Sequence, residues 1–318
     1  MTPASEHFEI KPLADGIFAA IATSGGAALS NAGIIDLGDR TLIFDAFNSV
    51  AAAEDLRSTA ERLTGRPPAL VIISHAHLDH WCGNQVFADR AAILATHRTR
   101  SEMLDEAQYV RNLKQDPSEM QEEIRSLGAQ WQSEVDPLYR ETLLAAIARS
   151  RREMEALPNL DLRLPDQTFE SSVLFHGPSR VAVLMSEGRG HTDSDAFLVL
   201  PEEHIVFLGD LGFFDCQPFM GDCDVEAWKA QLAGFEGSEF EVLVPGHGPL
   251  GSREDVTLQR RYIEVLVGLV SKVIRRGGSV DDALRITLPA PFEAWKATGR
   301  RRFETNVRTI CQRLTTGT

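Results

Sequence analysis

The pattern of hydrophobic and polar positions over residues 8–47 predicts a run of β-strands joined by turns. Short apolar runs, separated by glycine-containing turns, predict strands at 17–21, 32–37 and 41–44. Residues 51–63 carry apolar positions at helical spacing, so they predict an amphipathic helix, which Gly65 ends. Another strand is predicted over 69–74. Because strands and helix alternate along the chain, we expect an α/β fold.

The same pattern predicts more strands in the middle of the chain and helices at its end. The apolar runs that predict strands lie at 91–95, 168–174, 181–185, 196–200, 205–208 and 242–244. Residues 253–275 predict a long amphipathic helix, and residues 280–316 are also predicted to be helical, with a break at 289–291. We therefore expect one domain, residues 1–318, with a helical tail over about 253–318.

Residues 98–157 differ in kind from their surroundings. They are charged, rich in Glu, Arg, Gln and Leu, and they predict a helical insertion of two or three helices, with breaks at 116–117, Gly128 and 136–137. Among its apolar and aromatic side chains are Met103, Tyr109, Met120, Trp131 and Tyr139. Two interpretations stay open: a helical hairpin that packs on the body through these side chains, or a lid that contacts the substrate.

The strand predicted over 69–74 leads directly into a cluster of potential metal ligands. His75, His77, Asp79 and His80 lie within six positions of one another. Neutral imidazole nitrogens and carboxylate oxygens are ligands that a borderline cation such as zinc prefers. Residues two apart in an extended segment point the same way, so His75 and His77 can bind one ion together. Asp79 and His80 can face a second ion. A lone histidine is more often a core residue, but this density predicts a metal site.

Three later strands also end at potential ligands. The strands predicted at 181–185, 205–208 and 242–244 are followed by His191, Asp210 and His247, each beside a glycine. Glycine permits backbone turns that other residues resist and lets the chain approach an ion closely. An α/β protein assembles a site from residues at the ends of several strands, along one edge of the sheet.

Charge and composition narrow the class of partner. The chain has 32 Lys and Arg against 46 Asp and Glu, a net charge of −14, which disfavours nucleic acid. The densest basic run, Arg300-Arg301-Arg302, lies far from the ligands in sequence. No signal peptide or membrane-spanning run is predicted, and four cysteines without a Cys-x-x-Cys pair suit a reducing compartment. We expect a cytoplasmic protein with a small-molecule substrate, no nucleic-acid or membrane partner, and a homo-oligomer left open.

This set of motifs resembles the metallo-β-lactamase superfamily of hydrolases. The matching residues are Asp45, His-Ala-His-Leu-Asp-His at 75–80, Gly190-His191-Thr192, Gly209-Asp210 and Pro245-Gly246-His247-Gly248. The resemblance implies a four-layer αββα sandwich with two zinc ions at one edge of its sheets. By the same resemblance, His75, His77 and His191 would hold the first zinc, Asp79, His80 and His247 the second, and Asp210 would bridge them. Asp45 is similar to the superfamily's acid that orients a ligand histidine or its loop.

The acid at position 210 also narrows the branch of the superfamily. It is unlike the cysteine of the B1 and B2 β-lactamases and more similar to the glyoxalase II, lactonase and other hydrolase branches. The lactonase branch is expected to have a tyrosine just after this acid, where the present chain has 211–214, Leu-Gly-Phe-Phe. The loop between Cys216 and Cys223 is expected to form a wall of the pocket.

The activity that this resemblance implies is hydrolysis. A hydroxide that bridges two zinc ions would attack the carbonyl of a small organic substrate: an ester, a thioester, a lactone or a β-lactam. Asp79 and Asp210 are the expected catalytic acids. Two alternatives remain: a mononuclear iron enzyme similar to the persulfide dioxygenases, and β-lactamase as the specific activity. The fold and the metal ligands do not select among these substrates.

Overall fold

The computed structural model describes residues 5–316. The first four residues, on which part of the expectation of no signal peptide falls, lie outside the described residues. Among the residues described, no helix is long and apolar enough to cross a lipid bilayer.

Within residues 5–316, the first sheet contains seven strands in sequence order. They are β1 (Phe8–Ala14), β2 (Ile17–Ala22), β3 (Ala32–Asp36), β4 (Thr41–Phe44), β5 (Pro68–Ile72), β6 (Ala92–Thr96) and β7 (Gln167–Phe169). Strands β1 to β4 pair antiparallel, whereas β4 to β7 pair parallel. Parallel neighbours put the carboxyl ends of β4 and β5 at the same edge, where the chain leaves β5 for the histidine cluster.

The second sheet has the order β12-β11-β10-β9-β8. Its strands are β8 (Ser172–His176), β9 (Val181–Gly188), β10 (Asp195–Leu200), β11 (Ile205–Phe213) and β12 (Val242–His247). Only the pairing of β11 with β12 is parallel among those described. Strands β10 and β11 are buried along their whole length, which explains why both appear in the sequence as continuous apolar runs.

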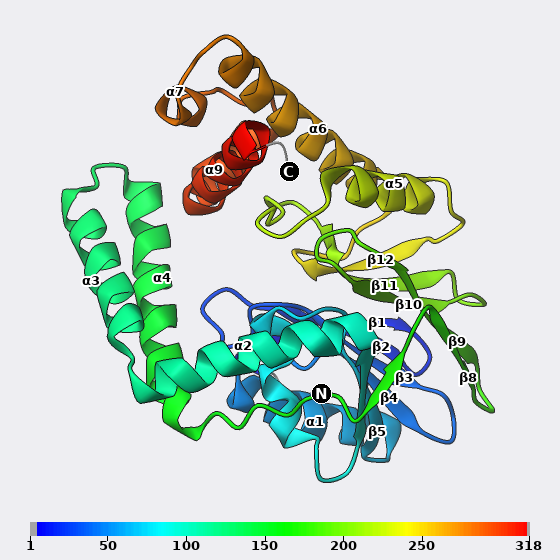
Figure 1. The fold of residues 1–318 in the computed structure, drawn as a ribbon. Coiled ribbons are helices and arrows are strands. Elements are labelled where there is room, and N and C mark those ends of the chain that lie inside the picture. The colour runs from blue at the N-terminus through cyan, green and yellow to red at the C-terminus, as the bar shows by residue number, and fades with distance from the viewer. Residues whose placement is uncertain (1–4, 317–318) are drawn as a thin grey trace.

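The two sheets pack face to face with helices on both outer faces (Figure 1). A buried core of side chains from both sheets lies between them, including Phe44 and Phe207, whose ring centroids are 5.9 Å apart. Helices α1 (Val50–Thr64) and α2 (His97–Gln115) pack on the first sheet. Helices α5 (Val225–Glu236) and α6 (Arg253–Arg275) pack on the second. The αββα sandwich expected from the sequence is therefore confirmed.

The insertion at 98–157 forms three helices: α2, α3 (Ser118–Ser133) and α4 (Pro137–Ala156). Helices α3 and α4 form a hairpin that projects from the body (Figure 1). Met103 is buried in the core beneath α2, and Trp131 and Tyr139 pack inside the hairpin. These three side chains are core contacts, as the packing interpretation requires, whereas Tyr109 is 42% exposed.

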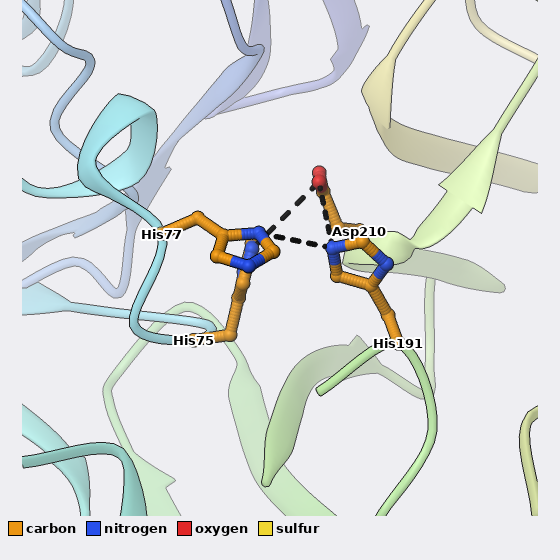
Figure 2. Close-up of side chains that lie close together, drawn as sticks. All are labelled: His75, His77, His191 and Asp210. Carbon is orange, nitrogen blue, oxygen red and sulfur yellow. Dashed lines mark hydrogen bonds and ion pairs between the residues drawn. The ribbon is translucent and has the colours of Figure 1, made fainter. Parts of the chain in front are cut away.

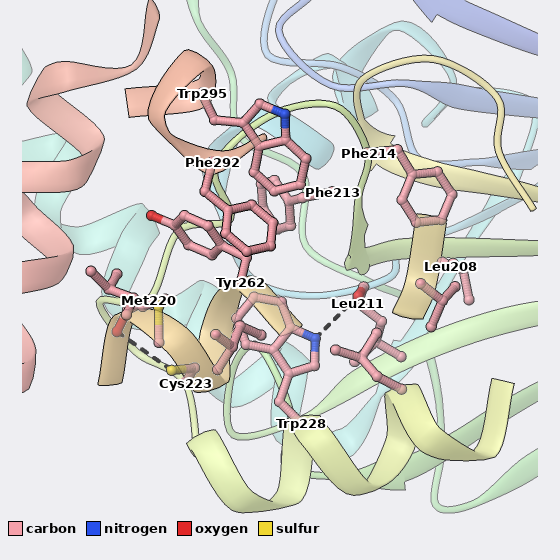
Figure 3. Close-up of a cluster of buried hydrophobic side chains, with 14 of the residues drawn as sticks. Leu208, Leu211, Phe213, Phe214, Met220, Cys223, Trp228, Tyr262, Phe292 and Trp295 are labelled. Atoms are coloured by element: carbon pink, nitrogen blue, oxygen red, sulfur yellow. Dashed lines mark hydrogen bonds between the residues drawn. The ribbon is translucent and has the colours of Figure 1, made fainter. Parts of the chain in front are cut away.

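The tail adds α7 (Val280–Leu284), α8 (Phe292–Thr298) and α9 (Arg300–Thr316) after α6. The predicted break at 289–291 lies within a longer non-helical segment, 285–291, and a second break at Gly299 was not predicted. An aromatic cluster joins these helices to the second sheet (Figure 3). In it Tyr262 of α6 packs against Phe292 and Trp295 of α8. The tail also contacts the hairpin, because Arg300 and Arg301 pair with Glu134 and Glu123 at 3.2 and 3.1 Å.

Three local predictions were wrong, and one helix was missed. The segment 168–174 is not one strand: it divides into β7 of the first sheet and β8 of the second, because here the chain crosses from one sheet to the other through exposed residues 170–171. Gly128 does not end a helix, since α3 continues through it. The extent of β11 was also underestimated, and Asp210 lies within the strand rather than after it. Helix α5 was not predicted.

Two glycines provide a matched test of these backbone conformations. A Cβ on Gly128 or on Gly65 would meet no atom within 4 Å, but Gly65 has a φ of +73°. Gly128→Ala should raise the free energy of unfolding by about 0.5–1 kcal/mol, because alanine loses less entropy in a helix. Gly65→Ala should lower it by about 1–2 kcal/mol, the cost of a left-handed alanine. Urea unfolding of both variants measures these changes, and a destabilising Gly128→Ala would contradict the helical assignment.

Candidate metal centre

The seven predicted ligands meet at one edge of the sandwich. His75 and His77 lie in the loop after β5, and a short 3-10 helix, η1 (Leu78–His80), carries the next two ligands. The other three come from the second sheet: one from the loop after β9, one from within β11 and one from the end of β12, namely His191, Asp210 and His247. The site therefore requires both sheets.

The first group of ligands is His75, His77, His191 and Asp210, whose candidate ligand atoms lie within 4.8 Å of one another. Figure 2 shows the three imidazoles gathered around the carboxylate. Asp210 Oδ2 lies 3.3 Å from His191 Nε2 and 3.7 Å from His75 Nε2. His77 Nδ1 lies 3.1 Å from His191 Nε2. The ring nitrogens thus face one small volume.

The second group is Asp79, His80 and His247, again with candidate ligand atoms within 4.8 Å of one another. Asp79 Oδ2 lies 3.2 Å from His247 Nε2 and 3.7 Å from His80 Nε2. Asp210 reaches this group as well, with Oδ1 3.1 Å from His80 Nε2 and Oδ2 3.4 Å from His247 Nε2. Asp210 is therefore the carboxylate that lies between the two groups, in the place expected of a bridging ligand.

Asp45 fixes the orientation of two of these histidines. This fully buried carboxylate follows β4 with a φ of 61° and accepts hydrogen bonds from the Ser74 amide, the Ser74 hydroxyl and His80 Nδ1, each at 2.8 Å. The Ser74 hydroxyl donates to Asp45, so it accepts from His75 Nδ1 at 2.9 Å. Both histidines thus carry a proton on Nδ1 and turn Nε2 toward the other ligands.

The ligand set fits a cation. Among the described side chains, His75 Nε2, His80 Nε2 and Asp210 Oδ1 are buried and make no well-aligned hydrogen bond, although the last two atoms lie 3.1 Å apart, and all three face the centre. Leaving a buried polar atom unsatisfied costs about 1–3 kcal/mol, so a functional ligand is the physical explanation for several in one place. Imidazole nitrogen with carboxylate oxygen is a donor set that suits zinc.

Comparison with known proteins identifies the family. The sequence pattern of the metallo-β-lactamase superfamily matches residues 25–247, most of the chain. This chain belongs to the metallo-β-lactamase superfamily. Membership confirms the resemblance seen in the sequence and the expectation of an enzyme of that superfamily. No curated protein matches the sequence significantly.

Solved structures of the superfamily share the fold. A metallo-β-lactamase from Pontibacter korlensis has a TM-score of 0.56 at 16% identity, covering 81% of this chain and 99% of that one. FIM-1 from Pseudomonas aeruginosa, in a mono-zinc form, has a TM-score of 0.55 at 16% identity, with 83% and 98% covered. A metallo-β-lactamase from Hirschia baltica has a TM-score of 0.55 at 15% identity, with 81% and 98% covered. At this identity the likeness concerns the fold.

Two residues that the sequence did not indicate, Asp222 and Asn31, also shape the site. Asp222, in the loop of residues 214–224 between β11 and α5, lies 3.0 Å from His77 Nε2 through its Oδ2. Since a carboxylate only accepts, His77 carries its proton on Nε2 and turns Nδ1 to the centre. Phe219 of the same loop packs against His77, with ring centroids 5.6 Å apart. The loop that was predicted to form a wall of the pocket therefore also orients a ligand histidine.

The second feature, Asn31, ties the His247 segment to the first sheet. Its side-chain amide donates to the carbonyl oxygens of Pro245 and Gly248, each at 2.9 Å, and its backbone amide donates to Gly246 O at 2.7 Å. A Cβ on Gly246 would lie 1.9 Å from Asp210 Oδ1. Glycine is therefore required there, because only a residue without a side chain allows this close approach to the bridging carboxylate.

Burial and neighbouring charge move the pKa values of the ligands in opposite directions. Burial lowers the pKa of His191 to about 3. Burial would lower the pKa of His247 as well, but the carboxylates of Asp210 and Asp79 outweigh it and raise that pKa to about 9. For Asp210, burial opposes ionisation, yet the imidazoles of His247 and His80 lower its pKa well below the usual value. At His80 the carboxylates of Asp210, Asp45 and Asp79 also outweigh burial and raise the pKa well above its usual value. Metal-free protein therefore holds extra protons on His247 and His80 at neutral pH.

The apparent zinc affinity of metal-free protein should rise between about pH 7 and 9. Zinc must displace protons from His247, whose pKa is about 9, and from His80, whose pKa is also raised, and this competition weakens as the imidazoles become neutral. Above that pH, the contribution of His247 should level off. Competition with a chromophoric chelator across this range measures the affinity. His176→Gln, an exposed position on β8, is the control and should leave the slope unchanged, whereas a flat profile would contradict the assigned proton.

Proposed function

We propose that this protein is a dinuclear zinc hydrolase that acts on the carbonyl group of a small organic substrate. The single observation that carries the proposal is the pair of ligand groups that share Asp210. His75, His77 and His191 would hold one zinc ion, and Asp79, His80 and His247 the other. When bound, the metal pair supplies Lewis acidity and a water whose pKa is lowered to about 7.

Exposure indicates how a substrate would approach. The side chains of His75, His80 and His191 are fully buried. Those of His77, Asp79 and His247 are 22%, 24% and 18% exposed. A substrate would therefore reach the centre from the side of these three residues. Asp79 is the carboxylate on that side, so we assign it the task of stabilising the leaving group or holding its proton.

The substrate class follows from charge and from the machinery. The net charge of −14 disfavours a polyanion such as nucleic acid. Oriented imidazole and carboxylate ligands suit attack on an electrophilic carbonyl, and esters, thioesters, lactones and β-lactams all offer one. The hairpin of α3 and α4 projects beside the body (Figure 1), and we propose that it influences which substrate binds.

Metal stoichiometry tests the bridging role of Asp210. The wild-type protein should bind about two zinc ions, and Asp210→Ala should bind about one with little hydrolysis, because its carboxylate lies between both ligand groups. Emission spectroscopy of dialysed protein measures the metal content. Exposed Asp161→Ala is the matched control and should keep both ions. Two ions and full activity in Asp210→Ala would rule out the bridge.

A substrate panel tests the reaction class. Zinc-loaded protein should hydrolyse at least one member of a panel of chromogenic ester, thioester, lactone and cephalosporin substrates. Its kcat/KM should rise with pH through an apparent pKa near or below about 7 and then level off. Iron alone in protein purified without added metal, with no hydrolysis across the panel, would instead favour an oxygenase of the persulfide dioxygenase kind.

A further inference from the structure

Helix α9 lies outside the matched segment 25–247, yet one face of it follows the loop of residues 214–224. Arg302, Asn306 and Arg313 are spaced by four and seven positions, which places them on one face of a helix. Each contacts this loop. The guanidinium of Arg302 lies 5.2 Å from the ring centroid of Phe219. The three arginines at 300–302 therefore have different partners: Arg302 contacts the loop, whereas Arg300 and Arg301 pair with the hairpin.

Asn306 holds the middle of the loop. Its side chain is fully buried; Nδ2 donates to Pro218 O at 2.8 Å, and Oδ1 accepts from the Met220 amide at 3.0 Å. Neighbouring helices fix the start of the loop, because Gln217 donates to the carbonyl oxygens of Trp295 and Gly299. Figure 3 shows Met220 and Cys223 of this loop beside the aromatic cluster of the tail. Both ends of the segment before Asp222 are thus anchored.

Arg313 acts directly on either side of Asp222. Its guanidinium donates to Gly221 O at 2.8 Å and to Cys223 O at 2.7 Å. These are the carbonyl groups of the residues that immediately precede and follow Asp222. The Asp222 side chain itself is 60% exposed, so its own packing does little to hold it. Its position beside His77 Nε2, 3.0 Å away, depends on the main chain that Arg313 fixes.

We propose that Arg313 and Asn306 are positioning residues for the metal centre, acting through Asp222 on His77. They hold the loop so that Asp222 keeps the proton of His77 on Nε2 and leaves Nδ1 toward the other ligands. A carboxylate in this place also raises the basicity of a ligand imidazole. The inference rests on the proposed metal centre and adds to it that the C-terminal helix is part of the machinery.

Zinc affinity of the full-length chain, measured by chelator competition with metal-free protein, tests the proposal. Asp222→Ala should weaken the binding of one zinc equivalent by about 10- to 100-fold, the usual effect of removing an outer partner of a ligand. Arg313→Met should weaken the same equivalent by at least about fivefold. The double variant should bind no more weakly than Asp222→Ala alone, because Arg313 acts through Asp222. Thermal unfolding without metal records stability separately.

Arg308→Met is the matched control, since Arg308 is exposed on the same helix, and it should bind zinc as the wild type does. If Arg313→Met lowers the melting temperature but keeps wild-type affinity, Arg313 only stabilises the fold and the proposal fails. Losses that add in the double variant also overturn it. If Arg313→Met does not fold, Arg313→Lys replaces it under the same criteria. A wild type that binds no zinc would refute the metal centre itself, which is a distinct result.

Discussion

One buried carboxylate, that of Asp45, determines which ring nitrogens of two histidines face the centre. It accepts a hydrogen bond from His80 directly, and it is linked to His75 through the Ser74 hydroxyl. It also accepts a hydrogen bond from the Ser74 amide, which fixes the main chain at the start of the ligand loop that follows β5. Its φ of 61° is uncommon for a residue other than glycine, and such conformations persist where surrounding bonds determine them. The two ligand groups depend on this anchor, since each contains one of the histidines.

The second requirement is that the two sheets pack in one fixed relative position, because the ligands come from both of them. Asp210 comes from β11, whereas the histidines it approaches most closely in the first sheet's loops are His75 and His80. Bonds between the sheets hold this arrangement: the Ala196 amide donates to Ser74 O at 2.8 Å, and Asn31 bonds to the chain on both sides of His247. Four imidazoles then surround the buried carboxylate of Asp210, and despite its burial the imidazoles of His247 and His80 hold its pKa well below the usual value.

The helices added to the sandwich contribute to the site from a distance. The tail fixes the loop that carries Asp222 and Phe219, and its first turn pairs with the hairpin through Arg300 and Arg301. The Arg301–Glu123 pair is exposed on both sides and the Arg300–Glu134 pair on the arginine side only. Surface ion pairs contribute about 0–1 kcal/mol each, whereas the hydrogen bonds of Asn306 are buried. The tail is therefore held more firmly to the loop than to the hairpin.

The sequence by itself determined the fold class and the candidate metal ligands, because local patterns and motifs along the chain indicate both. Strands buried on two faces appear as apolar runs, and His75 to His80 stand so close together that few roles other than metal binding suit them. Only the tertiary structure decided which oxygens and nitrogens orient those ligands. Asp222 is 145 positions from His77, and no local sequence pattern indicates that the two residues meet. The division of 168–174 between two sheets was hidden for the same reason: an apolar run reports that a strand is buried, but the sheet it joins is set by long-range packing.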